Sequence, residues 1–233
     1  MSSVNLNPLI EEADKKKNQG KHSEAIRICE SILASDLNCL EAYEEIGDNY
    51  LSLRKYDKAE KALMQALKID DKSANANYLL GFVYSCTNEW DKSVDLLEKA
   101  DQIYPNHPEI LRCLGWSMYH YGQRKRGIII LERALFLAPS DPLILNDIGV
   151  CYLNEKDFER AALLFKKTLQ VSPGDQKAKE CLNAVRFFQR EYEKLNKTKK
   201  TKTSKAPKKK INTKPKAKVK TKTKASTKTK SKK

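Results

Sequence analysis

Glycine recurs in this chain at a fixed interval of 34 residues, at Gly47, Gly81, Gly115 and Gly149. Three further columns keep the same phase and hold mainly tyrosine, alanine and proline: Tyr50, Tyr84, Met118 and Tyr152; Ala66, Ala100 and Ala134; Pro105, Pro139 and Pro173. A period of this length is typical of proteins in which one small structural unit stacks on the next. The chain is therefore expected to form a series of stacked units.

The columns hold the residue types that a helical hairpin needs. Glycine lets the first helix of a unit approach the second closely, and alanine does the same where the second helix meets its neighbours. Proline at the end of a unit cannot continue a helix. Two units depart from the pattern, because Asn77 replaces a large apolar residue and Gly127 replaces an alanine. We expect both positions to be locally softer, since glycine inside a helix costs about 1 kcal/mol relative to alanine.

These columns resemble the tetratricopeptide repeat, in which W-x2-L-G-x2-Y precedes A-x3-F and a closing proline. The match is clearest in two segments: Tyr43-x2-Ile46-Gly47-x2-Tyr50, and Leu145-x2-Ile148-Gly149-x2-Tyr152 with Ala161-x3-Phe165 and Pro173. The resemblance implies an all-α, right-handed solenoid of helix-turn-helix repeats. It divides residues 6–173 into five repeats that begin at residues 6, 40, 74, 108 and 142. Residues 174–195 are expected to form a capping helix.

The basic charge of the protein is confined to its C-terminal segment, residues 196–233. This segment holds 18 lysines and no acidic residue, while the preceding residues carry 27 basic and 30 acidic side chains, a net charge of −3. Such a composition cannot bury enough apolar area to fold, so we expect a disordered tail. Its charge would attract nucleic acid without sequence specificity, or an anionic membrane surface. A solubilising extension without a partner is the alternative. The lysines that we expect to bind polyanions are Lys208, Lys209, Lys210, Lys214, Lys216, Lys218 and Lys220.

In the resembled family, the first helix of each hairpin lines a concave face. That resemblance implies a peptide-binding groove across repeats 3 to 5, with several aromatic residues. The groove residues are Tyr78, Phe82, Arg112, Trp116, Tyr119, His120, Asn146 and Val150. Repeat 2 would add an acidic edge that favours a basic flank on the peptide, formed by Glu41, Glu44 and Asp48. Alternatively, some of these rings only seal neighbouring helices together, and Phe82 is the first candidate for that role.

One known use of the fold is a carboxylate clamp of lysine, asparagine and arginine side chains that holds the acidic C-terminus of a chaperone. The matching positions in this chain are Ile10, Asp14, Glu45, Asn75 and Leu79 or, one repeat later, Glu44, Asp48, Leu79, Glu109 and Cys113. Neither set can pair with a carboxylate as the clamp requires. A co-chaperone of that kind is therefore not expected.

The sequence contains no recognisable catalytic or cofactor-binding pattern. It lacks the glycine-rich phosphate motifs, and its histidines and cysteines do not have metal-ligand spacing. The cysteines are spread singly as Cys29, Cys39, Cys86, Cys113, Cys151 and Cys181. We therefore expect no enzyme activity, no cofactor and no metal. The start of the chain has no secretory signal pattern and no long apolar run is present, which favours a cytoplasmic location.

Three functions fit these observations. The first is a protein-interaction scaffold, adaptor or chaperone-like protein that holds a protein or peptide ligand in the groove, with the tail bound to a polyanion. The second is a nucleic-acid or ribosome-associated factor that acts through the tail. The third is a bacterial secretion chaperone or pilus-assembly protein. The sequence does not decide the partner, the pathway or the oligomeric state.

Overall fold

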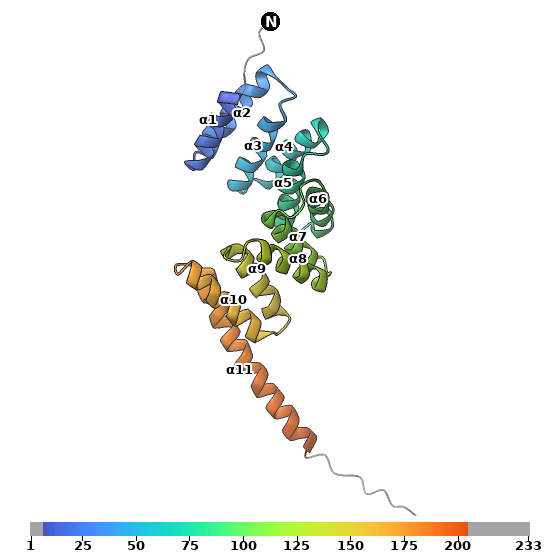
Figure 1. Ribbon diagram of the computed structural model, residues 1–233, viewed down its shortest axis with the longest axis vertical. Helices are drawn as coiled ribbons and strands as arrows, with labels where there is room; N and C mark the ends of the chain where they lie inside the picture. Colours follow the sequence, from blue (N-terminus) through green and yellow to red (C-terminus); the bar gives the residue numbers. More distant parts are fainter. Residues whose placement is uncertain (1–6, 205–233) are drawn as a thin grey trace, which may run out of the picture. The chain divides into compact units, whose positions relative to one another are not determined.

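The computed structural model describes residues 7–204, and within this range it contains eleven α-helices and no strand (Figure 1). The helices are α1 (Asn7–Asn18), α2 (His22–Ser35), α3 (Leu40–Ser52), α4 (Tyr56–Ile69), α5 (Ala74–Cys86), α6 (Trp90–Ile103), α7 (Pro108–His120), α8 (Arg124–Leu137), α9 (Pro142–Asn154), α10 (Phe158–Val171) and α11 (Gln176–Ser204). The predicted all-α repeat fold is confirmed. The predicted polyanion-binding lysines, Lys208 to Lys220, lie outside the described residues.

The chain divides into two compact units, Met1–Glu191 and Tyr192–Lys233, and the first contains all the helical hairpins. Within it, α1 packs on α2, α3 on α4, α5 on α6, α7 on α8 and α9 on α10 (Figure 1). The second helix of each hairpin packs on the first helix of the next, and consecutive first helices also touch. Helices α3, α5, α7 and α9 begin at residues 40, 74, 108 and 142, where the sequence places the starts of repeats 2 to 5.

The turn between the two helices of each hairpin has a residue in the left-handed region of backbone space. The five positions recur every 34 residues: Gly20, Arg54, Asn88, Gly122 and Lys156. A left-handed residue after a helix redirects the chain and lets backbone N–H groups reach the last carbonyls of the helix. In the second hairpin, for example, the N–H of Lys55 donates to the carbonyl of Tyr50 at 2.8 Å. The repeat is therefore built into the turns as well as the helices.

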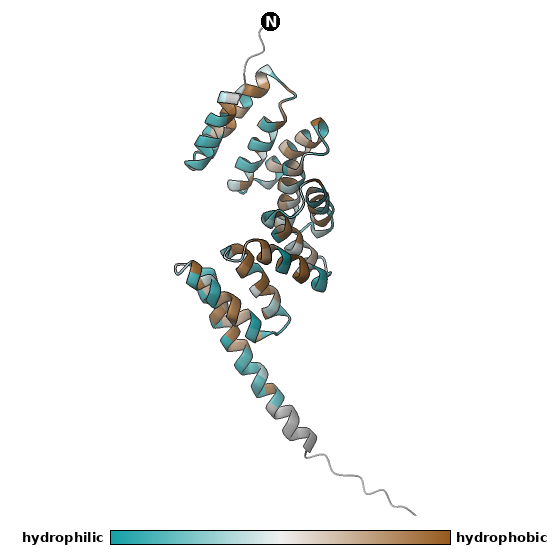
Figure 2. Ribbon diagram, in the orientation of Figure 1, coloured by the Kyte–Doolittle hydropathy of each residue, from teal (hydrophilic) through white to brown (hydrophobic). Residues whose placement is uncertain are grey.

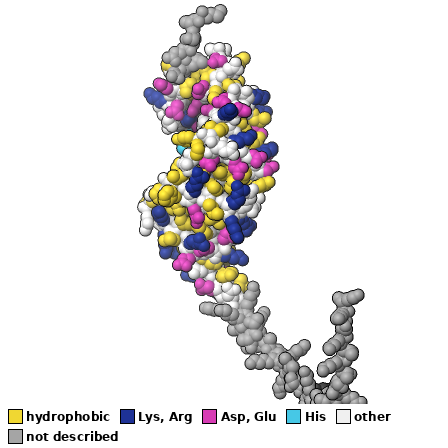
Figure 3. Space-filling model, turned by 45° about the vertical axis from the view of Figure 1, so that its right-hand side comes forward, with side chains coloured by type: hydrophobic (Ala, Val, Ile, Leu, Met, Phe, Trp, Pro, Cys, Tyr) yellow, Lys and Arg dark blue, Asp and Glu magenta, His cyan; other side chains and the backbone are white. Residues whose placement is uncertain are grey.

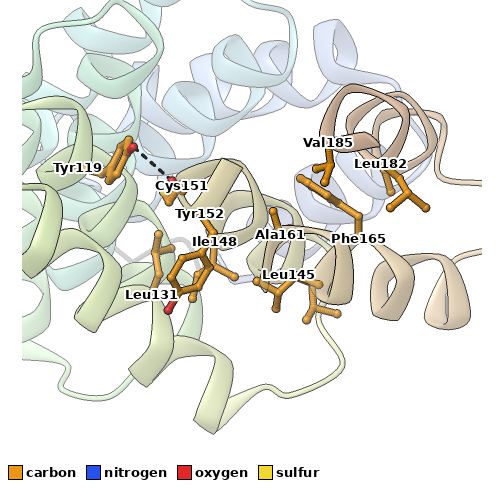
Figure 4. Packing of buried hydrophobic residues seen from close by; sticks show 12 residues of the cluster. Tyr119, Leu131, Leu145, Ile148, Cys151, Tyr152, Ala161, Phe165, Leu182 and Val185 are labelled. Carbon is orange, nitrogen blue, oxygen red and sulfur yellow. Dashed lines mark hydrogen bonds between the residues drawn. The ribbon is translucent and has the colours of Figure 1, made fainter. Parts of the chain in front are cut away.

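The core is a chain of small clusters between successive helices, which agrees with the alternation of hydrophobic and hydrophilic residues along each helix in Figure 2. The cluster drawn in Figure 4 includes Tyr119 and Leu131 from repeat 4, Phe165 from repeat 5, and Leu182 and Val185 from α11. The first part of α11 therefore covers the apolar side of the fifth repeat, as a capping helix does. The helix continues past the predicted end of the cap at residue 195, because no proline or glycine interrupts the chain between Gly174 and Pro207.

The glycine column marks close approaches inside the hairpins. A Cβ at Gly81 would meet the Cγ of buried Leu97 at 2.7 Å. In repeat 4, the contact is between backbones, since a Cβ at Gly127 would lie 2.5 Å from the carbonyl oxygen of Gly115. Asn77 is also buried, and its amide donates to the carbonyl of Ser73 at 2.7 Å. Looser packing, which we expected at Asn77 and Gly127, is visible at neither position.

Candidate functional site

The predicted groove residues lie on α5, α7 and α9, the first helices of repeats 3 to 5, but they differ in burial. Tyr78, Phe82, Trp116 and Val150 are half-buried. Tyr119 and Asn146 retain only 4% and 3% of their accessible surface. Partly exposed side chains can contact a partner, whereas Tyr119 and Asn146 are placed to support the face from within. The same applies to Arg112, whose side chain is 12% exposed.

A row of rings crosses repeats 3 and 4. Tyr78 and Phe82 are nearly parallel, with ring centroids 6.4 Å apart. The imidazole of His120 is 4.4 Å from the ring of Trp116 and 4.8 Å from the ring of Trp90. We call Tyr78, Phe82, Trp90, Trp116 and His120 the aromatic row. Trp90 begins α6, a second helix, and was missed because the family resemblance directs attention to first helices only.

In repeats 1 to 3, polar side chains on the same face bridge each first helix to the first helix of the next repeat. Lys17 of α1 contacts Glu45 at 2.9 Å and Asp48 at 3.1 Å, both on α3. Glu44 of α3 accepts hydrogen bonds from the hydroxyl of Ser73 and from the amide of Asn75 in the next repeat. Two members of the predicted acidic edge, Glu44 and Asp48, therefore have partners within the protein. Glu41, the third member, is exposed, and its carboxylate lies 3.7 Å from the thiol of Cys39.

Arg112 is the centre of a second, more buried polar group. Its guanidinium binds Glu109 on its own helix and Asp147 on α9 at 2.7 Å. The hydroxyl of Tyr78 donates to Glu109 at 3.2 Å, so the group links α5, α7 and α9. One step further, Asn146 donates to Asp175, just before α11, at 2.9 Å. Arg112 was predicted to face a peptide, but in the structure its charge is matched by two carboxylates of the same chain.

The pKa values of the two carboxyl groups show how strongly Arg112 is engaged. Burial raises the pKa of Asp147, and the charge and hydrogen bond of Arg112 offset only part of that effect. Burial also acts to raise the pKa of Glu109, but hydrogen bonds from Arg112 and Tyr78 outweigh it and leave this pKa below its ordinary value. A charge that holds the buried carboxylate of Asp147 and the partly buried carboxylate of Glu109 contributes to the integrity of the face.

Tyr119 has a similar internal role. Its hydroxyl donates to the carbonyl of Cys151 at 3.3 Å, shown as the dashed line in Figure 4, and lies 3.1 Å from Glu155. Burial and the hydrogen bond to Glu155 raise the pKa of Tyr119 to about 12. The phenol therefore stays a neutral donor that joins repeat 4 to repeat 5.

A pocket of about 400 Å³ opens beside the aromatic row, where repeat 2 meets repeat 3. Its lining combines the ends of α3 and α5 with the start of α4. The residues of this pocket, which we call the Phe82 pocket, are Leu51, Ser52, Arg54, Tyr56, Phe82 and Cys86. Of these, only Phe82 belongs to the predicted groove.

The surface drawn in Figure 3 has hydrophobic side chains between basic and acidic ones, without a large area of a single charge sign. Among the described residues, no group of three histidine, cysteine, aspartate or glutamate side chains is placed to hold a metal ion. Within the same part of the chain, no helix is long and apolar enough to cross a membrane.

Comparison with known proteins supports the repeat assignment. Models of the tetratricopeptide repeat family match residues 40–73 and 122–176. Anaphase-promoting complex subunit 3 of Schizosaccharomyces pombe is 27% identical over 97 residues, which are 42% of this chain and 15% of that protein. The chain thus corresponds to less than a fifth of the length of this relative.

Solved structures show the same architecture. The anaphase-promoting complex hetero-tetramer Cut9–Hcn1 matches with a TM-score of 0.71 and 17% identity over 76% of this chain and 35% of the other. YrrB, described as a tetratricopeptide repeat protein with an unusual peptide-binding site, matches with a TM-score of 0.58 and 19% identity over 74% of this chain and 89% of the other. With these likenesses beside the hairpins and the 34-residue columns, the chain contains tetratricopeptide repeats, which the family models match over residues 40–73 and 122–176.

Proposed function

We propose that this protein is an interaction scaffold that holds a peptide segment of a partner against the first helices of repeats 3 to 5. The observation that carries this proposal is the aromatic row, whose rings stay partly exposed while the charged groups of Lys17, Glu44 and Arg112 are paired within the protein. Exposed apolar clusters on folded proteins mark interaction sites, and large aromatic residues dominate binding energy at such sites.

The internal bridges make this face suitable for binding. Lys17, Glu44 and Arg112 each join one first helix to the next, so the backbone under the rings is fixed before a partner arrives. A face that is already ordered loses less conformational entropy on binding. Peptide contact then falls to Tyr78, Phe82, Trp116, His120 and Val150, the members of the predicted groove that are not fully buried.

The similar proteins support a role in assemblies. Two of them bear the name of a multi-subunit complex, and a third is named for its peptide-binding site. Because this chain corresponds to only a small part of the first relative, we carry over the general role of holding partners and no particular complex.

The test compares partner capture by two variants of the full chain. A variant with Trp116→Ala and His120→Ala removes the centre of the aromatic row. Its matched control, with Ile129→Ala and Phe136→Ala, removes two side chains that are 61% and 84% exposed on α8, a second helix. Crosslinking and quantitative mass spectrometry in the native cell would measure the partners held by each variant.

We expect the aromatic-row variant to lose captured partners while the control keeps them. The melting temperature of each variant is measured as well, because Trp116 also packs on the core of repeats 4 and 5. Equal capture by the aromatic-row variant and the wild type would overturn the proposal. Tyr119→Ala is unsuitable for this purpose, because Tyr119 is buried and its loss would report on packing.

The C-terminal segment supports a second candidate function. Residues 196–233 carry a charge of +18, and this charge favours the binding of a polyanion by the segment, including its lysines from Lys208 to Lys220. Deleting residues 205–233 should abolish retention on heparin at low salt while capture through the aromatic row is unchanged. Unchanged retention would exclude this function for the tail.

A further inference from the structure

The 34-residue period allows the Phe82 pocket to be compared, residue by residue, with the equivalent place one repeat later. Tyr56 corresponds to Trp90, Phe82 to Trp116, and Cys86 to His120. Both places therefore have two aromatic side chains, Tyr56 and Phe82 in one and Trp90 and Trp116 in the other. The remaining residue is a cysteine with a small thiol in the first place and a histidine with an imidazole in the second. This pairing of two rings occurs only at these two boundaries among the described repeats, since the corresponding pairs elsewhere are His22 with Asp48 and Arg124 with Val150.

At the later boundary, the equivalent space is occupied by the protein itself. The imidazole of His120 contacts both flanking indoles, and its plane is inclined by only 22° to that of Trp90. Burial lowers the pKa of His120, so the ring that fills this space is uncharged at neutral pH. At the earlier boundary, the smaller Cys86 side chain, which has a hydrogen bond with Tyr56, lines a pocket of about 400 Å³ together with both flanking rings.

We propose that the Phe82 pocket receives an aromatic side chain of a partner peptide, which lies between Tyr56 and Phe82 as His120 lies between Trp90 and Trp116, next to a peptide carboxylate that pairs with Arg54. The proposal rests on the proposed function, because it assigns a side-chain pocket to the same binding face. It extends that face from repeat 3 into repeat 2.

The charge at the pocket favours the carboxylate. Arg54 is the charged residue of the lining, and it is exposed on the turn between α3 and α4. It makes no salt bridge with the described residues. Burial raises the pKa of the Cys86 thiol, while a hydrogen bond with Tyr56 and the positive charges of Arg112 and Arg54 act to lower it. An anionic group beside the inserted ring would meet a complementary field.

The experiment uses small probes and the full chain, so it needs no identified partner. Phenylacetate supplies an aromatic ring and a carboxylate, cyclohexylacetate replaces the flat ring with a thicker one, and phenethylamine reverses the charge. Binding is followed by the amide shifts of the protein in NMR spectra. We expect phenylacetate to cause saturable shifts near Ser52, Arg54 and Cys86, and both other probes to bind several times more weakly.

Two reciprocal variants test the comparison between repeats. Cys86→His should fill the pocket with the ring that the next repeat already contains, and should weaken phenylacetate binding by at least about tenfold, or 1.4 kcal/mol. His120→Cys should open an equivalent pocket and add a second, weaker set of shifts near Trp90 and Trp116, because Asn88 stands there in place of Arg54. Cys86→Met is a second way to fill the space if the histidine variant does not fold.

Unchanged phenylacetate binding in the folded filled variant, or shifts spread evenly over the surface without saturation, would overturn the proposal. Such a result leaves the scaffold function standing, because partner capture through Trp116 and His120 is measured separately. Conversely, a pocket that binds phenylacetate in a protein whose aromatic-row variant still captures every partner would support the pocket and contradict the scaffold proposal.

Discussion

The boundary between repeats 2 and 3 and the boundary between repeats 3 and 4 have the same backbone plan but different chemistry. At the first, the contact between α4 and α5 is apolar and includes the buried side chains of Ala59 and Val83. At the second, the equivalent positions are Ser93 and Ser117, whose hydroxyls lie 2.8 Å apart. Both boundaries are closely packed, so the repeat fold accepts either an apolar or a hydrogen-bonded contact at this position.

The proposed binding face also differs between the two boundaries. The first has an open pocket and the partly exposed hydrogen bonds of Glu44. The second has a filled aromatic stack and the hydrogen bond from Tyr78 to Glu109, which connects to the pair of Arg112 and Asp147 between repeats 4 and 5. The columns that define the repeat therefore fix the backbone, while positions outside the columns decide where a partner finds space and where the protein holds itself together.

The largest effect is expected from the loss of Arg112, whose polar group joins the boundary between repeats 3 and 4 to repeat 5. Arg112→Met leaves Asp147 and Glu109 without their main cation, and breaking a buried pair in this way costs about 3–5 kcal/mol. The matched change at the first boundary, Glu44→Gln, should cost less than about 1 kcal/mol, because the hydrogen bonds of Glu44 are partly exposed. Urea denaturation at pH 7 would measure both free energies of unfolding.

The Arg112→Met variant should also regain part of its lost stability as the pH falls. Without Arg112, the pKa of Asp147 in the folded state rises further above its unfolded value, because burial already raises it. Between those two values the folded state binds more protons, so acid stabilises it relative to the unfolded chain. The deficit relative to wild type should shrink from pH 7 toward pH 5. A deficit that is constant over this range would show that Arg112 acts through packing alone.

These two boundaries also show what the sequence could and could not predict. The hairpins, their starting residues and the placement of Tyr78 and Trp116 on first helices follow from columns 34 residues apart, which reflect backbone geometry. The pairing of Arg112 with Asp147 depends on side-chain reach between neighbouring helices, which periodicity does not specify. Trp90 was missed because it begins a second helix, although its correspondence to Tyr56 in the repeat was visible. The peptide groove itself stays a prediction.

A medium effect is expected from the serine pair. Ser93 donates to the carbonyl of Gly81 at 2.7 Å, and it shares a buried hydrogen bond with Ser117. Ser93→Ala or Ser117→Ala should each cost about 1–2 kcal/mol, because a buried hydroxyl loses its partner. The double variant should cost less than the sum and should resemble the apolar pair of the first boundary. A double-mutant cycle with additive energies would contradict a direct interaction between the two hydroxyls.

The smallest effect concerns the turns beside the two boundaries. Arg54 and Asn88 are equivalent residues with φ angles of 55° and 65°, a region that costs most residues about 1–2 kcal/mol but that asparagine tolerates. Arg54→Gly should therefore stabilise the protein by about 0.5–1 kcal/mol after the greater chain entropy of glycine is deducted. Arg54→Asn should give part of that gain, and Asn88→Gly should give almost none. Because neither Arg54 nor Asn88 has a salt bridge in the described chain, thermal unfolding would report on backbone strain alone. Equal gains at the two positions would mean that the turns, unlike the faces they connect, do not distinguish one boundary from the other.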